Sequence, residues 1–354
     1  MHVRYLLSIV TIIILTGCSS PDDDMSQGKE YPSANKSDNT NAAECRWIYQ
    51  QMNHYYLWRS DLPDSLACDY SLEPAVFFKS LLSTKDRFSY CTRNTGYTGS
   101  TEVVFDDDPN YPIDFMTRSD DDHAVLLDSI YHIGDKKIGY LCYLKFSNAV
   151  ELVPVMKRFW ENHIDELIVD LRYNLGGYVS VCRYLCNCVV AKSAYDQVFQ
   201  YKVYNDVVTT ELVMQTGKDK ESESYDFPPQ SYDGLLGTPV YPLDMQRVYV
   251  LTSNRTASAS EAFIICLHPF TKTIVIGEQT VGKGVGSFTV RESKYFYELH
   301  PITMRYYNSV METTPDTGIS PDFLVSGGNQ TFVGDIGKVD EPLLAVALQQ
   351  IHKW

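Results

Sequence analysis

The amino-acid sequence predicts an α/β fold. In the second half of the chain, short runs rich in Val, Ile, Tyr and Phe alternate with longer stretches that carry helical spacing of apolar residues. Such alternation indicates βαβ units with a parallel component in the sheet. The chain has 354 residues, and we assign residues 136–354 to one large domain with a sizeable core.

The expected elements of this domain follow in order along the chain. Strands are predicted from β-branched and aromatic runs, and helices from apolar residues spaced three and four apart. They are a strand at 138–146, a helix at 149–162, a strand at 166–171, a helix at 178–190, a hairpin at 197–214, a polar loop at 216–241, strands at 248–251 and 273–277 on either side of a helix near 262–267, and outer strands within 288–307.

Three further regions precede this domain. Residues 18–43 are polar and show no periodicity, which predicts a flexible tether. Residues 44–90 predict a small helical region rich in aromatic residues, and residues 91–135 form a separate Asp-rich region before the large domain.

Ser258 and Lys283 lie 25 residues apart in settings typical of a nucleophile and its base. Ser258 stands where a strand pattern ends and a helical pattern begins. Unpaired N–H groups and the helix dipole there favour the negative charge that develops during acyl transfer. Lys283 follows the next strand inside Gly282-Lys283-Gly284. An amine activates a serine only where burial favours its neutral form.

Both positions also have simpler interpretations. The run 258–261 reads S-x-x-E, a helix capping box, and Thr256 and Ser260 compete with Ser258 for any role as nucleophile. The run 277–283 matches most of a phosphate-binding P-loop, but Gly284 replaces the required Ser or Thr and a strand pattern follows.

A third segment, D-L-R-Y-N-L-G-G at 170–177, ends a buried strand. Together with R-T-A-S-A-S-E at 255–261 and G-K-G at 282–284, it resembles the motifs of the C-terminal processing peptidases, or tail-specific proteases, which are Ser-Lys serine peptidases. G-I-S-P-D at 318–322 and D-E-P-L at 340–343 extend the resemblance over residues 136–354.

The resemblance implies a role for each matching residue. Ser258 would be the nucleophile and Lys283 the general base. The N–H of Ala259 and an N–H of the Gly176–Gly177 pair would form the oxyanion hole, because glycines let the backbone approach a substrate carbonyl closely. The implied fold is crotonase-like, with stacked ββα units. The implied substrate is a polypeptide, and the chemistry needs no cofactor and no metal.

Two departures from the family pattern stand out. The family often has glutamine four residues after the lysine, and here that position is Ser287, whose hydroxyl can accept a hydrogen bond from an amine. In the family, a segment like D-R-F-S-Y at 86–90 precedes a PDZ domain of roughly 80 to 90 residues that captures substrate C-termini. Only 47 residues separate Tyr90 from Ile138, so we expect the PDZ domain to be missing or reduced within 91–135.

The N-terminus predicts export. Residues 1–17 carry one early basic residue and then an apolar run of signal-peptide length. The ending L-T-G-C resembles a bacterial lipobox, which makes Cys18 the lipidated first residue of the mature protein. Asp22-Asp23-Asp24 just after it resembles the acidic signals that send some lipoproteins to the outer face of the outer membrane, and a solvated tether explains these residues equally well. We expect a lipid anchor in the outer membrane, on its periplasmic side or at the cell surface.

The composition limits the partners. A formal net charge of -15 repels nucleic acid. Eight cysteines follow Cys18, and most are expected to be small buried thiols, with Cys45 and Cys68 the best candidates for one disulfide.

The function expected from these observations is a serine endopeptidase that cuts exported polypeptides near their C-termini through an acyl-enzyme. A non-catalytic peptide-binding relative and a Ser-Lys hydrolase of other acyl substrates remain as alternatives. The sequence leaves the oligomeric state open.

Overall fold

The computed structural model describes residues 37–93, 102–105, 123–225, 238–327 and 335–353. The predicted signal peptide and Cys18 lie outside these residues. Within them, no helix is both long enough and apolar enough to cross a bilayer.

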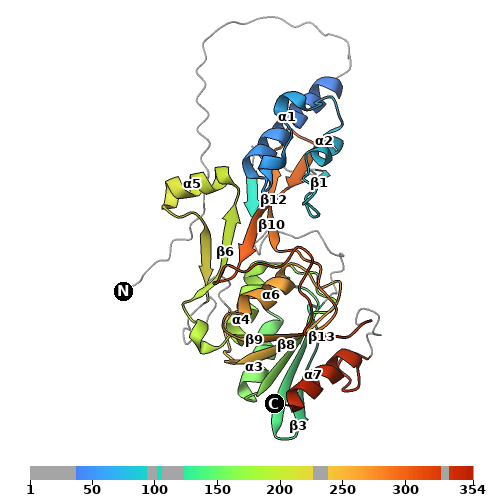
Figure 1. Cartoon of the computed structure of the whole chain (residues 1–354), viewed down its shortest axis with the longest axis vertical. Coiled ribbons are helices and arrows are strands. Elements are labelled where there is room, and N and C mark those ends of the chain that lie inside the picture. Colours follow the sequence, from blue (N-terminus) through green and yellow to red (C-terminus); the bar gives the residue numbers. More distant parts are fainter. Residues whose placement is uncertain (1–36, 94–101, 106–122, 226–237, 328–334, 354) are drawn as a thin grey trace, which may run out of the picture. The chain divides into compact units, whose positions relative to one another are not determined.

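A six-stranded sheet forms the centre of the large domain (Figure 1). Its order is β13-β9-β8-β5-β4-β3, and all neighbours are parallel except the β3–β4 hairpin. The strands are β3 (Val125–Ile133), β4 (Lys136–Tyr143), β5 (Glu166–Asp170), β8 (Arg247–Thr252), β9 (Lys272–Gly277) and β13 (Phe323–Leu324). Every residue of β5 is buried, which explains why the three residues between its charged ends, 167–169, are all apolar.

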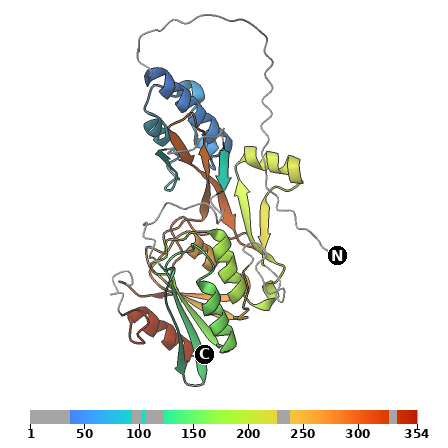
Figure 2. The ribbon, with the colours of Figure 1, turned by 180° about the vertical axis from the view of Figure 1, so that it is seen from behind.

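Helices cover both faces of this sheet. Alternate strand residues face two separate cores, one built with α3 (Leu152–Glu161), α4 (Val179–Val189) and α6 (Ala259–Leu267), the other with α7 (Pro342–His352). Figure 2, seen from behind, shows α7 at the sheet apart from the other three helices. The βαβ arrangement predicted from the sequence is therefore present.

A second, antiparallel sheet has the order β1-β11-β10-β12-β6-β7, and β2 also pairs with β10. Its strands are β1 (Tyr90–Arg93), β2 (Glu102–Phe105), β6 (Val198–Tyr204), β7 (Glu221–Ser224), β10 (Val285–Arg291), β11 (Tyr297–His300) and β12 (Ile302–Tyr307). The expected outer strands within 288–307 are confirmed. Figure 1 shows the N-terminal helices beside this sheet: α1 (Ser37–Tyr55) and α2 (Pro74–Ser80), with 3-10 turns at Arg59–Asp61 and Ser65–Ala67 between them.

The hairpin expected at 197–214 is wrong. Strand β6 is followed by helix α5 (Asp206–Thr216). The Asn205 side chain accepts a hydrogen bond from the N–H of Val208 at 2.9 Å, and Gly217 ends the helix with φ 71°. These two caps fix a helix in a stretch whose β-branched residues favour a strand.

Two expected boundaries also shift. Helix α1 begins at Ser37, within the expected tether, because extending a packed helix by a few residues is nearly neutral in free energy once it is nucleated. The boundary expected at 135/136 falls inside the β3–β4 hairpin, so part of region 91–135 belongs to the central sheet. The described strands β1 and β2 of that region pair with β11 and β10.

The expected disulfide is absent: all eight described cysteines are free. The thiol of Cys45 donates to the Leu72 carbonyl at 3.4 Å, and that of Cys68 donates to the Asp64 carbonyl at 3.5 Å. Burial raises the pKa of Cys45 to about 12, so this sulfur stays a thiol.

Candidate active site

Three loops of the candidate site follow the ends of three adjacent parallel strands. Gly176 and Gly177 follow β5, Ser258 follows β8 and Lys283 follows β9. Because parallel strands end at the same edge of a sheet, residues far apart in sequence meet there. Helices α4 and α6 also begin at this edge, so the positive ends of both dipoles point to the same place.

Ser258 is the N-cap of α6 and has φ 57° and ψ -117°. Positive φ is rare for a residue with a side chain and marks a strained turn. The N–H of Ser258 donates to the Glu261 carboxylate at 2.9 Å, which is one half of the capping box that the sequence indicated, whereas the Ser258 side chain makes no cap hydrogen bond. The serine also lines a pocket and is half-buried.

The competing hydroxyls are already engaged. The Thr256 hydroxyl donates to the Leu171 carbonyl at 2.9 Å, and the Ser260 hydroxyl donates to the Asn174 carbonyl at 3.0 Å. Both residues are fully buried. They fasten the β8–α6 turn to the glycine loop, which leaves Ser258 as the serine of this turn that faces the pocket.

A single buried carboxylate, that of Glu261, joins the serine turn to the lysine loop. It accepts the N–H groups of Ser258 at 2.9 Å, Gly282 at 2.7 Å and Lys283 at 2.8 Å, and also the Thr280 hydroxyl. Sequence reasoning treated Glu261 mainly as a cap partner. The S-x-x-E spacing was the available signal, but it does not reveal the bonds to the other loop.

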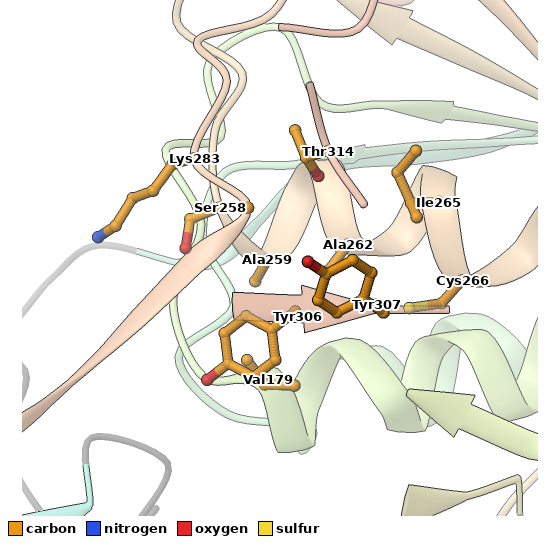
Figure 3. Close-up of a pocket in the computed structure, with 11 residues that line it drawn as sticks. Val179, Ser258, Ala259, Ala262, Ile265, Cys266, Lys283, Tyr306, Tyr307 and Thr314 are labelled. Atoms are coloured by element: carbon orange, nitrogen blue, oxygen red, sulfur yellow. The ribbon is translucent and has the colours of Figure 1, made fainter. Parts of the chain in front are cut away.

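Lys283 lies next to Ser258 at one end of the pocket, as Figure 3 shows. Its Nζ atom is 5.5 Å from the ring centroid of Phe88, a residue of the N-terminal region. Ser287 lies further along on β10, where the pairing with β12 shifts register between Gly286 and Ser287. The orienting role of Ser287 stays a prediction.

Gly176 and Gly177 differ in what each offers to the site. A Cβ on Gly176, which has φ 109°, would lie 2.7 Å from the Ser258 Cβ and 3.0 Å from the Ala259 nitrogen. The Gly176 N–H donates to the Asn174 side chain at 2.9 Å. No described residue accepts the N–H of Gly177 or of Ala259. The N–H groups of Ala259 and Gly177 therefore stay the candidates for the oxyanion hole, and their role stays a prediction; Gly176 provides space.

The pocket beside Ser258 is mostly apolar and has about 350 Å³ of empty volume, part of it open to solvent. Its lining residues away from Ser258 and Lys283 are Val179, Ala259, Ala262, Ile265, Cys266, Gly284, Tyr306, Tyr307 and Thr314. Burial raises the pKa of Cys266 well above its usual range, so this sulfur is a protonated thiol and a poor nucleophile.

A buried ionic group lies at the start of the segment that carries the two glycines. Arg172 is fully buried, pairs with Asp170 at 2.8 Å and donates to both carboxylate oxygens of Glu341 at 2.6 and 2.9 Å. Burial raises the pKa of Glu341, but the hydrogen bonds from Arg172 outweigh this effect and keep that pKa below its usual value. Because Glu341 caps α7, this group ties the C-terminal helix to the segment that carries the glycines.

Comparison with known proteins identifies the fold and family. The model of peptidase family S41 matches residues 137–325, which is more than half of the chain. This protein belongs to peptidase family S41. The model of the peptidase S41 N-terminal domain matches residues 43–90, the region expected to be helical. The expected resemblance to C-terminal processing peptidases is therefore confirmed, and the family is one of serine-type peptidases.

Two curated relatives match parts of the chain. The chloroplastic carboxyl-terminal-processing peptidase 1 of Arabidopsis thaliana is 31% identical over 43% of this chain and 26% of its own length. A probable CtpA-like serine protease of Staphylococcus aureus is 27% identical over 53% of this chain and 33% of its own length. The matches thus span a third or less of these relatives.

Two solved structures share the fold. A putative S41 protease from Bacteroides fragilis has a TM-score of 0.68 at 20% identity and covers 93% of this chain and 99% of its own. A putative peptidase from Parabacteroides merdae has a TM-score of 0.50 at 17% identity and covers 89% of this chain and 97% of its own.

We predict that Gly176→Ala lowers turnover about 100-fold, because the added methyl displaces Ser258 and narrows the space at the Ala259 N–H. Gly134→Ala is the matched control, since Gly134 also has positive φ, 58°, but open space around it. The control should lose about 1 kcal/mol of stability and keep its turnover. Peptidase assays and thermal unfolding of both variants measure this, and equal turnover in the two would contradict the assignment.

We predict that Glu261→Gln lowers turnover at least about tenfold and lowers the free energy of unfolding by about 2–4 kcal/mol, because an amide NH2 would face backbone donors. Glu73→Gln is the control. Glu73 is exposed and accepts two backbone N–H groups at the start of α2, at 3.0 and 3.2 Å. It should lose little stability and no turnover. Wild-type turnover in Glu261→Gln would show that the two loops do not need this carboxylate.

Proposed function

We propose that this protein is a serine endopeptidase with a Ser258–Lys283 dyad. The observation that carries the proposal is the position of Ser258: it lies in an apolar pocket with Lys283 beside it, and the N–H groups of Ala259 and Gly177 have no acceptor among the described residues. Both alternatives expected from the sequence use the same pocket: a non-catalytic relative would bind a polypeptide there without cutting it, and a hydrolase of other acyl substrates would cut a different class of molecule.

The proposed reaction has two steps. In the first, the neutral amine of Lys283 takes the hydroxyl proton as Ser258 Oγ attacks the peptide carbonyl carbon, and the N–H groups of Ala259 and Gly177 bind the oxyanion. Collapse breaks the C–N bond, and Lys283 gives its proton to the leaving amine. In the second, Lys283 takes a proton from water as the water oxygen attacks the Ser258 ester. Collapse breaks the bond to Ser258 Oγ, Lys283 returns its proton to that oxygen, and the released acid ionises to the new carboxylate.

The pocket supports an uncharged residue on the N-terminal side of the cut bond, because its lining is mostly apolar. The name of the Arabidopsis relative, a carboxyl-terminal-processing peptidase, supports cleavage near C-termini. The lipobox-like sequence at Cys18 supports a lipid-anchored enzyme of the outer membrane that acts on exported polypeptides.

We predict that Ser258→Ala and Lys283→Ala each abolish hydrolysis and leave the fold intact, because the two groups act as one unit. The test incubates each protein with a mixture of unfolded polypeptides and identifies new termini by mass spectrometry. Wild-type activity should rise with pH, since only the neutral amine is a base.

Three results would contradict this proposal in different ways. Full turnover in either variant would reject the dyad. Hydrolysis of small acyl esters but of no polypeptide would favour a hydrolase of other acyl substrates. Binding of polypeptides without cleavage by the wild type would favour a non-catalytic relative.

We predict that Ser287→Ala lowers turnover several-fold with little change in KM, because a misplaced base weakens the transition state more than substrate binding. Ser287→Gln, which restores the family residue, should preserve or raise turnover. Steady-state kinetics across pH measure both variants. Unchanged turnover and an unchanged pH profile in Ser287→Ala would reject an orienting role for this hydroxyl.

A further inference from the structure

A short segment of the N-terminal region lies directly on the loop that carries Lys283. The guanidinium of Arg87 donates to three backbone carbonyls: Val281 at 3.2 Å, Gly282 at 2.8 Å and Asp316 at 2.7 Å. Two of these carbonyls belong to the residues immediately before the lysine. Arg87 therefore fixes the peptide units from which the Lys283 side chain starts.

The next residue, Phe88, faces the lysine amine itself. Its ring centroid lies 5.5 Å from Lys283 Nζ and 4.7 Å from the guanidinium carbon of Arg87. Both distances are within the range at which a cation is attracted to a ring face. The ring thus limits where the end of a long, flexible side chain can lie.

The turn that carries Arg87 and Phe88 is itself held in place by hydrogen bonds, so it can fix the position of the lysine loop. One carboxylate oxygen of Asp86 accepts the N–H groups of Phe88 and Ser89 at 2.9 Å each, and the other accepts the Tyr56 hydroxyl at 2.8 Å. The Ser89 hydroxyl accepts the N–H of Ile302 at 2.7 Å. Arg87 and Phe88 therefore sit on a turn that is fastened to the end of α1 and to β12.

The lysine loop is consequently held from two sides. Glu261 accepts its N–H groups from the α6 side, and Arg87 donates to its carbonyls from the N-terminal region. Nη2 of Arg87 is the donor to the Gly282 and Asp316 carbonyls, and both terminal nitrogens reach the Val281 carbonyl, at 3.2 and 3.4 Å; a lysine ammonium would present one nitrogen in place of these two. Neither Arg87 nor Phe88 lines the substrate pocket, so their effect on the reaction passes through Lys283.

We propose that Arg87 and Phe88 are positioning residues for Lys283, so that the N-terminal region completes the active site of the catalytic domain. This inference rests on the proposed function of the Ser258–Lys283 dyad. It assigns a role to the D-R-F-S-Y segment that does not depend on any PDZ domain.

The test compares Arg87→Ala with Arg59→Ala. Arg59 is a matched control because it also joins the N-terminal region to the large domain, through an ion pair with Asp206 of 2.9 Å at the start of α5. We expect Arg87→Ala to lower kcat about tenfold or more with KM within about twofold, and Arg87→Lys to recover only part of the loss. Arg59→Ala should keep wild-type kcat.

Hydrogen exchange supplies a readout that needs no activity. The amides of Gly282 and Lys283, measured in a peptide that spans them, should exchange faster in Arg87→Ala than in wild type, and should be unchanged in Arg59→Ala. If Arg87→Ala matches Arg59→Ala in both kcat and exchange, the inference is overturned. If the wild type hydrolyses no polypeptide, the proposed function fails, and the exchange result alone still decides whether Arg87 fixes the loop.

Phe88 is tested by a pair of variants. Phe88→Leu keeps an apolar side chain but removes the ring face, and should lower kcat several-fold without faster exchange of the loop, because Arg87 still holds the backbone. Phe88→Tyr keeps the ring and should restore kcat. A Phe88→Leu enzyme with wild-type kcat would overturn the role of the ring.

Discussion

The arrangement of this site depends on one fully buried carboxylate. Glu261 accepts hydrogen bonds from the backbone of both Ser258 and Lys283, and from Gly282 and Thr280. A buried carboxylate is stable only when such donors surround it, and backbone donors are stable in a buried loop only when an acceptor meets them. Each loop therefore requires the other, and the serine and the lysine cannot drift apart without leaving buried polar groups unpaired.

The topology of the central sheet brings the serine loop and the lysine loop close enough to share these hydrogen bonds. Strands β5, β8 and β9 are parallel neighbours, and each ends at the same edge in a loop of the site. The helix after β5 and the helix after β8 both begin there, so backbone N–H groups and helix dipoles converge where an oxyanion would form. Gly176 keeps that space open, since even a methyl group would meet Ser258.

Much of this could be read from the sequence because it is local. Buried strands, the helix that starts after Ser258 and the glycine pair each leave a signal within a few neighbouring residues. Two features that sequence reasoning missed are also local: the caps of α5 outweigh the strand preference of its β-branched residues, and the Gly176 N–H is taken by a side chain two residues away. The contacts of Glu261 with the lysine loop and of Arg87 with the same loop join segments 21 and 194 residues apart, which no local pattern encodes.

The central claim is that Ser258 attacks a carbonyl whose oxygen is held by Ala259 and Gly177. A crystal structure of the protein with a peptide boronic acid tests this directly, because boron forms a tetrahedral adduct with a nucleophilic serine. The account predicts a bond from boron to Ser258 Oγ, with one boronate oxygen about 3 Å from the Ala259 and Gly177 nitrogens. A boronate bound to another residue, or an oxygen directed away from both N–H groups, would contradict it.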